Sequence, residues 1–300
     1  MKDTERIRQF LSSPRLGPYV HACKGDLNAS LELYQVNVRL SASFWPLLSM
    51  LEVSLRNALD REFSHHFGTK DWFEPLETLL RTKGEEKIRK LERKLGPAPK
   101  GYRQKEPLLH TAGKIKGLRN SIISRKENNL RNGVKIELRK TPGFSGADQF
   151  QRIRMIDAEF AKRKAVARLG VVHSDMISEA TFSFWTSLFK NEVYSALKGL
   201  QIRIFSNRRP DIKAKDIAWM LDSVRRYRNR IAHNEPLCFS QGRFDLTGAQ
   251  ECCDYTERLL FMLNEKLEEY TQAIYMIHES INDAKSFISV IRRLVSANNP

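Results

Sequence analysis

The residues whose types and spacing suggest chemistry lie together in one short segment, Arg228-Asn229-Arg230-Ile231-Ala232-His233-Asn234-Glu235-Pro236. Arginine has a planar, permanently charged guanidinium group whose geometry matches the oxygens of a phosphate. Histidine has an ordinary pKa of about 6.5, so its imidazole can take up and release a proton near neutral pH. In a strongly basic chain, this combination points to the cleavage of RNA.

Strand cleavage would need neither a metal nor an activated water, because RNA carries its own nucleophile, the 2′-hydroxyl group. It needs a base for that hydroxyl, an acid for the departing 5′-oxygen and positive charge near the phosphorus. We assign proton transfer to His233, phosphate binding to Arg228 and orientation or hydrogen bonding to Asn229. One segment supplies one histidine for two proton transfers. A two-fold dimer would supply the second, and the alternative is His65 or His66 of the same chain.

The segment 211–233 must position these groups, and its pattern predicts one amphipathic helix. Apolar side chains recur at steps of three and four residues and form a core stripe of Ile217, Met220, Val224, Tyr227 and Ile231. The opposite side carries Asp222, Arg226, Asn229 and His233. We expect Arg228 at the edge of the stripe and Pro236 just beyond the end of the helix. A histidine outside the stripe favours a functional role. The alternative is an exposed polar face in which Glu235 pairs with a nearby arginine.

The composition indicates a helical protein with an anionic partner. The 300 residues carry a formal net charge of +16, which predicts attraction to polyanions. Nucleic acid is the first candidate and an anionic membrane surface the second. No apolar run approaches the roughly 18 residues that span a bilayer, and the N-terminus lacks an apolar signal core. We therefore expect a cytoplasmic protein with RNA, and no membrane, as its partner.

The cysteines suggest no metal or redox chemistry. Cys23, Cys238, Cys252 and Cys253 form no Cys-x-x-Cys pair, and the last two would point to different sides of a helix. We expect buried or idle thiols in place of a disulfide framework or a zinc site, and we predict no metal and no cofactor.

The chain divides into three segments of an all-α fold: residues 1–95, a basic insertion at 96–172 and residues 173–300. Helices are predicted over residues 4–12, 26–67, 75–95, 149–168, 176–205, 211–233 and 247–298. Pro46 marks a kink or a fresh start within 26–67, and Asn282-Asp283 marks a break in the last helix. An apolar stripe within 26–67 consists of Leu48, Leu51, Leu55 and Leu59.

Residues 100–140 are rich in arginine and lysine, and glycine and asparagine interrupt their helical pattern. They form either a solvated, partly mobile insertion or a surface that follows RNA phosphates, since each neutralised phosphate adds affinity by counterion release. The candidate contacts are Lys114, Lys116, Arg119, Arg125, Lys126 and Arg131, together with Arg203, Arg208, Arg209 and Lys213 around the start of the predicted helix at 211–233. For the latter group, solvated surface is an equal alternative. We expect Trp185 and Trp219 in the core.

Several blocks are similar to Abi-like (abortive infection) proteins of the HEPN superfamily, whose signature is an arginine followed by four to six residues and a histidine. Arg228–His233 matches that signature. The other matching blocks are Tyr34-Gln35-Val36-Asn37 with Leu40-Ser41-Ala42, Leu51-Glu52-Val53-Ser54-Leu55-Arg56-Asn57, and Glu179-Ala180-Thr181-Phe182-Ser183-Phe184-Trp185. The blocks occur in the family's order. Two positions depart from it: Asn234 stands where a second histidine is common, and Ser183 stands where glycine is usual.

The resemblance implies an all-α, HEPN-type helical bundle with additional N- and C-terminal helices, which forms a homodimer with a composite site. It implies a metal-independent endoribonuclease that acts as a toxin in antiphage defence, with a catalytic set of Arg228, Asn229 and His233. Some relatives are associated with a structured noncoding RNA, which makes such an RNA an expected partner. The alternative function is a non-catalytic RNA-binding protein that sequesters such an RNA or is held by it.

Three further residues are expected to support the site: Arg56, Asn57 and Glu235. For Arg56 the resemblance competes with a simpler explanation. It lies four residues from both Glu52 and Asp60, which is the spacing of ordinary ion pairs on a helix surface.

Overall fold

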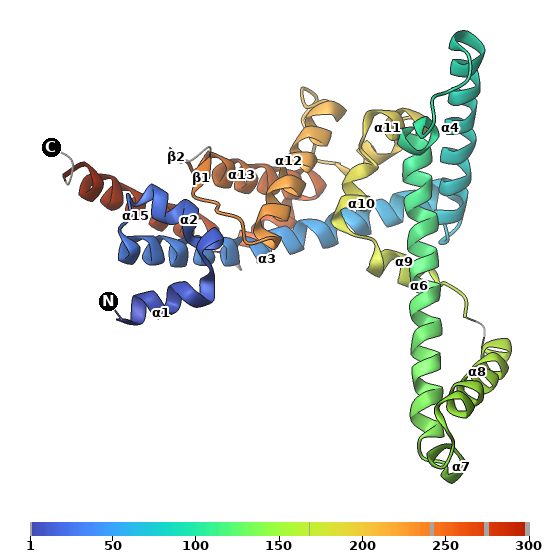
Figure 1. Cartoon of the computed structure of the whole chain (residues 1–300). Helices are drawn as coiled ribbons and strands as arrows, with labels where there is room; N and C mark the ends of the chain where they lie inside the picture. The colour runs from blue at the N-terminus through green and yellow to red at the C-terminus, as the bar shows by residue number, and fades with distance from the viewer. Residues whose placement is uncertain (1, 168, 241–242, 273–275, 298–300) are drawn as a thin grey trace. The chain divides into compact units, whose positions relative to one another are not determined.

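The computed structural model describes residues 2–167, 169–240, 243–272 and 276–297, and it is almost entirely helical (Figure 1). Across the described part, 79% of the chain is helical, in fifteen α-helices. The strands β1 (Phe239–Ser240) and β2 (Arg243–Phe244) form one short antiparallel pair. The predicted all-α class is therefore confirmed. In those ranges, no helix combines the length and the hydrophobicity that a bilayer crossing requires.

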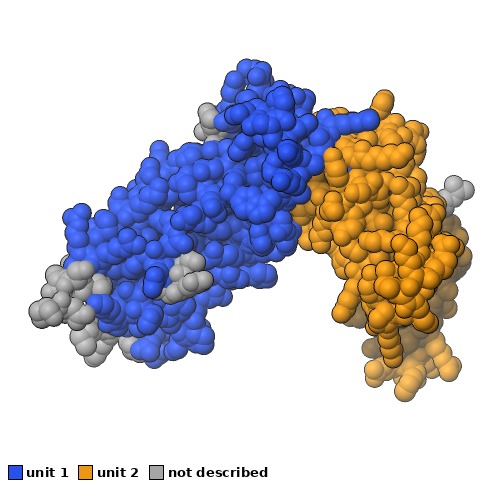
Figure 2. All heavy atoms as spheres, turned by 90° about the horizontal axis from the view of Figure 1, so that it is seen from above, with its two compact units in different colours: residues 1–59, 201–300 blue, residues 60–200 orange. Residues whose placement is uncertain are grey.

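The chain forms two compact units, which Figure 2 shows in different colours. The first contains residues 1–59 and 201–300, so both ends of the chain contribute to it, and the second contains residues 60–200. The boundaries fall inside α3 (Leu27–Phe67) and at the start of the 3-10 helix η1 (Leu200–Ile204). The Arg228–His233 motif lies in the first unit, and the predicted insertion at 96–172 lies within the second.

The first unit contains α1 (Lys2–Leu11), α2 (Ser13–Ala22), the N-terminal part of α3, α12 (Ala214–Ala232), α13 (Thr247–Leu263), α14 (Glu265–Gln272) and α15 (Ile277–Ala297). The predicted stripe of α3 is confirmed, since all four of its leucines are buried. The predicted stripe of α12 is also confirmed, because its five members are each at most 5% exposed. Burial of one such side chain contributes about 1.5–3 kcal/mol. The motif helix, which packs along α13, is therefore held by its apolar face.

The helices predicted at 4–12 and 26–67 are confirmed, and of the two alternatives for Pro46 the fresh start of a helix is wrong. The helix predicted at 4–12 is followed directly by a second one, because Ser12 adopts a left-handed φ of 65° between α1 and α2. Pro46 does not end α3, which continues through it for 41 residues in all. A proline removes one backbone hydrogen bond, but buried Phe44, Leu47 and Leu48 hold the helix in the core on both sides of it.

The predicted break at Asn282-Asp283 is wrong as well, because α15 runs through both residues. The C-terminal helices separate earlier, at Asn264. Its extended backbone, with φ −168°, ends α13, and its side chain accepts the N–H of Lys266 at 2.9 Å, where α14 begins. The predicted helix at 247–298 also spans residues 273–275 and 298, which lie outside the described ranges.

The second unit contains α4 (Phe73–Leu95), α5 (Tyr102–Lys105), α6 (Pro107–Leu138), α7 (Pro142–Ser145), α8 (Gln149–Val166), α9 (His173–Glu179), α10 (Phe182–Ser187) and α11 (Asn191–Ala196). α6 packs against α4 and α8. The first of these contacts is close at Gly84 of α4, where a Cβ atom would lie 2.8 Å from the Leu109 side chain. Both α4 and α8 lie where the sequence predicts helices.

The 32-residue helix α6 corrects the prediction that glycine and asparagine interrupt residues 100–140. A glycine inside a helix costs only about 1 kcal/mol relative to alanine. The apolar face of α6 offsets this by burying Leu108, Ala112, Ile115, Ile122 and Val134. Glu106 caps its N-terminus, because the carboxylate accepts the N–H of Leu109 at 2.9 Å. The basic segment is therefore a packed helix.

The single helix predicted at 176–205 is replaced by α9, α10, α11 and η1. Thr181 starts α10 by accepting the N–H of Phe184 at 3.3 Å. After α11, Lys198 and Gly199 adopt left-handed φ values of 52° and 76°. These turns break a segment that contains no proline to mark them.

Candidate functional site

The candidate site is the C-terminal end of α12. The helix ends at Ala232, and His233 follows as its cap, with an exposed side chain. The N–H of Asn234 binds the Ile231 carbonyl at 3.0 Å, and the N–H of Glu235 binds the Arg230 carbonyl at 2.9 Å. This pair of bonds is a Schellman motif, which satisfies carbonyls that the helix end would otherwise leave free.

The Schellman motif gives a physical reason for Asn234, which departs from the family pattern. Asn234 has a left-handed φ of 51°. After glycine, asparagine is the residue that adopts this conformation most readily. The side chain at this position therefore serves the turn that ends α12 directly after His233.

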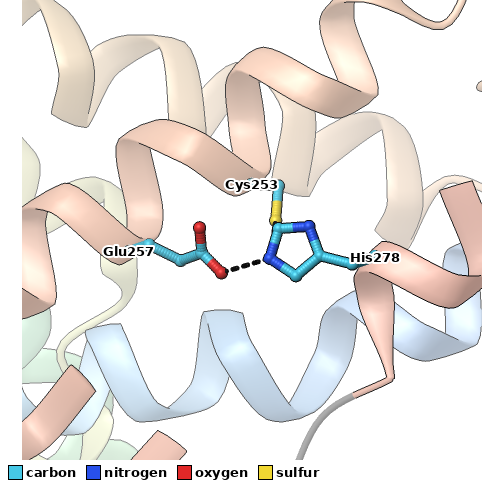
Figure 3. Close-up of side chains that lie close together, drawn as sticks. All are labelled: Cys253, Glu257 and His278. Atoms are coloured by element: carbon cyan, nitrogen blue, oxygen red, sulfur yellow. Dashed lines mark hydrogen bonds and ion pairs between the residues drawn. The ribbon is translucent and has the colours of Figure 1, made fainter. Parts of the chain in front are cut away.

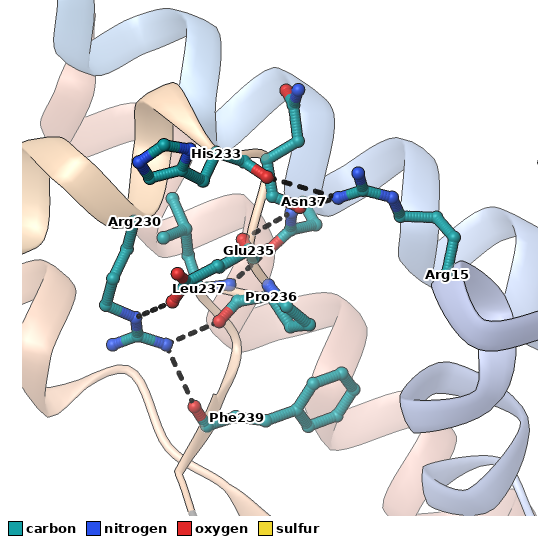
Figure 4. Close-up of polar contacts among 9 residues, drawn as sticks. Arg15, Asn37, Arg230, His233, Glu235, Pro236, Leu237 and Phe239 are labelled. Carbon is teal, nitrogen blue, oxygen red and sulfur yellow. Dashed lines mark hydrogen bonds and ion pairs between the residues drawn. The ribbon is translucent and has the colours of Figure 1, made fainter.

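Arg15 and Asn37 fix this turn from two other helices (Figure 4). Arg15 of α2 donates from Nη1 to the His233 carbonyl at 3.3 Å and to the Asn234 carbonyl at 2.6 Å. Asn37 of α3 is only 2% exposed. Its Oδ1 accepts the N–H of Leu237 at 2.5 Å, and its Nδ2 lies 3.5 Å from the Glu235 carbonyl. Side-chain hydrogen bonds thus hold the backbone both at residues 233–234 and at residues 235–237.

Arg230 is the third residue, after Arg15 and Asn37, whose side chain holds the backbone of this segment (Figure 4). Its Nη2 donates to the carbonyls of Pro236 at 2.5 Å and Phe239 at 3.4 Å, and its Nε lies 3.5 Å from the Glu235 carboxylate. The guanidinium also lies over the Tyr227 ring, 5.4 Å from its centre. Glu235 therefore does pair with a nearby arginine, and this contact alone does not decide between the functional and the structural interpretation of His233. Arg230 therefore stabilises the segment that follows α12.

Arg228 faces α3 rather than His233. Its Nη2 lies 3.7 Å from a carboxylate oxygen of Glu52, and its guanidinium lies over the Trp45 ring at 5.8 Å. The Arg228 side chain remains 31% exposed. Five residues of helix separate Arg228 and His233 by about 140° around the axis and about 7.5 Å along it. Within the described ranges, no side-chain hydrogen bond joins Arg228, Asn229 and His233.

Among the residues that the structure describes, the expected surface ion pairs of Arg56 with Glu52 and Asp60 are not found. Glu52 pairs with Arg228, and Asp60 is 2.7 Å from both Trp72 Nε1 and His173 Nε2. In the described part of the chain, the buried Nε of Arg56 has no hydrogen-bond partner. Arg56 is partly buried and Asn57 is exposed, and a role for either in the site stays a prediction.

Four of the six basic side chains on α6 that are candidates for RNA contact form ion pairs with carboxylates. Arg119 pairs with Glu77 at 2.9 Å, Arg125 with Glu179 at 2.8 Å, Lys126 with Asp175 at 2.6 Å and Arg131 with Asp157 at 2.5 Å. These ion pairs join α6 to α4, α8 and α9. Lys114 is partly buried, and Lys116 is exposed. Carboxylates of the second unit therefore neutralise much of the positive charge of α6.

The basic residues before α12 lie in the first unit and are mostly exposed. Arg209 makes a bidentate contact with Asp211 at 3.0 and 3.1 Å, and Arg208 donates to the Ile212 carbonyl. Arg203 and Lys213 are exposed. RNA contact by this group stays a prediction.

The two tryptophans differ from each other. Trp185 is completely buried, as predicted. Trp219 is 52% exposed and packs edge-on against Tyr255, so its predicted place in the core is wrong. It lies beside the α12 stripe, on a helix whose core face is already filled by the five stripe residues.

All four cysteines are buried free thiols, as predicted. Burial raises the pKa of both Cys238 and Cys252 to about 12, so neither is a thiolate near neutral pH. Cys253 differs because Glu257 and His278 place metal-binding atoms beside it. The Cys253–Glu257 spacing of four residues is visible in the sequence, but His278 reaches them only through the fold.

No protein-family model, no curated protein and no solved structure matches this chain. The resemblance to the HEPN superfamily stays a prediction, and the function has to be inferred from the site itself.

Proposed function

We propose that this chain is the subunit of a homodimeric, metal-independent endoribonuclease of the Abi-like HEPN type, acting on RNA in the cytoplasm as an antiphage toxin. The observation that carries the proposal is the rigid presentation of His233. An exposed imidazole follows the last turn of a helix whose apolar face is buried, and Arg15, Asn37 and Arg230 fix the backbone around it.

Rigid support matters because proton transfer depends on position. Catalytic groups have to be held within about 0.5 Å of their working geometry by surrounding packing and hydrogen bonds. In the proposed reaction His233 moves the proton of the 2′-hydroxyl group or of the 5′-oxygen. Cleavage by this route leaves a 2′,3′-cyclic phosphate on one product and a 5′-hydroxyl on the other.

Arg228 is suited to bind the scissile phosphate. Its distance of 3.7 Å from Glu52 is an ion-pair contact but exceeds hydrogen-bond length. The guanidinium is therefore oriented by Glu52 and Trp45 while its donors remain available to phosphate oxygens. Asn229 precedes His233 by one turn of α12 and would orient the substrate.

Two considerations support a dimer. One chain supplies one motif histidine for two proton transfers, and Arg228 and His233 point about 140° apart around α12. A second copy related by a two-fold axis would bring its own Arg228 and His233 to the same phosphate. Trp45, which is 39% exposed beside Arg228, offers an apolar contact for that copy.

The test is cleavage of labelled RNA, with analysis of the product ends. The wild-type protein should give 2′,3′-cyclic phosphate ends with or without a chelator, and His233→Ala should reduce the rate by at least about 100-fold. His65→Ala and His66→Ala test the alternative that the same chain supplies the second histidine. A dimer site predicts unchanged rates for both variants, whose side chains are exposed. Full activity of His233→Ala, or an absolute requirement for magnesium, would contradict the proposal.

A non-catalytic RNA-binding protein is the second candidate, and the orientation of Arg228 towards α3, away from His233, favours it. Binding of RNA, unlike its cleavage, does not require both side chains to act on one phosphate. In this version the motif grips RNA, including a structured noncoding RNA, without cutting it. Tight binding with intact RNA after prolonged incubation would support this candidate over the enzyme.

A further inference from the structure

Three metal-binding side chains meet where α15 begins against α13 (Figure 3). Cys253 and Glu257 are four residues apart on α13 and so share one face of that helix. His278 lies in the first turn of α15. Its Nε2 atom is 2.7 Å from Oε1 of Glu257 and 3.9 Å from Sγ of Cys253. The three ligand atoms all lie within 4.8 Å of one another.

The two distances from His278 Nε2 are close to those around a tetrahedral zinc ion. With bonds of about 2.3 Å to sulfur and about 2.0–2.1 Å to nitrogen or oxygen, neighbouring ligand atoms lie roughly 3.3–3.6 Å apart. The sulfur–nitrogen distance of 3.9 Å already approaches this value. The nitrogen–oxygen distance would open by roughly 0.6 Å, because the metal replaces the hydrogen bond between His278 and Glu257.

The burial and the charges of the cluster favour a divalent cation. Cys253 is completely buried, and the Glu257 carboxylate lies beside it. A zinc ion would balance a thiolate and a carboxylate, so the occupied cluster would carry no net charge. The Glu257 and His278 side chains are 18% and 52% exposed, which leaves the cluster accessible from solvent on the His278 side.

We propose that Cys253, Glu257 and His278 form a zinc site with a fourth position for water. Sulfur and imidazole ligands suit zinc better than magnesium or calcium, which prefer oxygen alone. Binding releases the Cys253 proton to solvent and exchanges the His278–Glu257 hydrogen bond for two metal bonds. The ion would fasten the start of α15 to α13, and it lies outside the Arg228–His233 motif and its proposed metal-free chemistry.

The test uses the full-length protein, stripped with a chelator and dialysed, then titrated with Zn²⁺ by calorimetry and with Co²⁺ by absorption spectroscopy. We expect one ion per chain and a cobalt–thiolate charge-transfer band. Cys253→Ser should abolish the band, whereas Cys252→Ser, a change of the adjacent buried thiol, should retain it. His278→Ala should weaken Zn²⁺ binding by more than about tenfold, since even outer ligands of zinc contribute 10–100-fold. The His278 side chain is half exposed, and a melting curve checks that the variant remains folded.

Absence of stoichiometric binding, or unchanged Zn²⁺ affinity in His278→Ala, would overturn the zinc site. The result is distinguishable from a failure of the proposed nuclease. Stripped protein should still cleave RNA at a temperature where it remains folded, and His233→Ala should still bind one zinc ion.

Discussion

Replacement of Asn37 by alanine tests whether the turn after α12 is fixed by α3. Asn37 is 2% exposed, and its two polar atoms face the N–H of Leu237 and the carbonyl of Glu235. These partners set the orientation of the amide, because the oxygen must face the N–H and the nitrogen must face the carbonyl. The N–H of Leu237 belongs to a residue that is 1% exposed, so water cannot readily replace the lost acceptor.

The expected magnitude follows from that unsatisfied donor. Leaving a buried polar group without a partner costs about 1–3 kcal/mol. The alanine gains up to about 0.7 kcal/mol of helix propensity over asparagine, which offsets part of this loss. Since 1 kcal/mol shifts the Tm of a domain of 150–250 residues by about 2–4 °C, we expect the Tm of Asn37→Ala to fall by several degrees.

Asn57→Ala is the matched control, because it makes the same change on the same helix at an exposed position. The gain in helix propensity is common to both variants, so the difference in their free energies of unfolding isolates the Asn37 contacts. Urea denaturation followed by circular dichroism gives that difference. Equal stability of the two variants would refute the claim that Asn37 holds the turn that carries His233.

Three further predictions follow from other contacts. Arg230→Ala should lower the free energy of unfolding by about 1.5–3 kcal/mol, the range for hydrogen bonds to a charged group. Exposed Arg226→Ala should change it by less than about 0.5 kcal/mol in the same denaturation assay. The hydrogen bond from Lys126 lowers the pKa of Asp175, so its stabilisation is present above about pH 4 and lost as pH falls through the lowered pKa. The stability gap between wild type and Asp175→Asn, measured by denaturation, should therefore narrow between pH 7 and pH 3. Trp45→Ala should weaken the proposed dimer, with a shift toward monomer in sedimentation at unchanged secondary structure.

The periodic spacing of apolar residues correctly predicted which face of an individual helix is buried. The stripes of α3 and α12 follow from the spacing of apolar residues, and every predicted member is buried. Elements whose local sequence conflicts with their packing were missed. Glycines and asparagines suggested breaks within α6, but contact with α4 and α8 outweighs their low propensity. The turns at Thr181 and Gly199 depend on local caps and backbone conformation that the apolar pattern does not reveal.

The candidate site was predictable only in part for the same reason. The exposure of His233 and its place at the end of α12 follow from the helical pattern and from Pro236. The supports from Arg15 and Asn37 join residues about 200 positions apart, and no local pattern encodes such contacts. The pairing of Glu52 with Arg228 was not predicted, because Glu52 and Arg56 have the four-residue spacing of an ion pair within one helix. The meeting of Cys253 with His278 likewise depends on how α15 packs.

The most direct test of the central claim, that two copies of His233 act at one site, is a subunit-mixing titration. Wild-type and His233→Ala chains are mixed at constant total concentration, allowed to exchange subunits and assayed for RNA cleavage. If both copies are required, an equal mixture should retain about one quarter of the wild-type activity, because only that share of dimers contains two wild-type chains. Retention of about one half, with a linear decline across the titration, would show that each chain acts alone and would contradict the account.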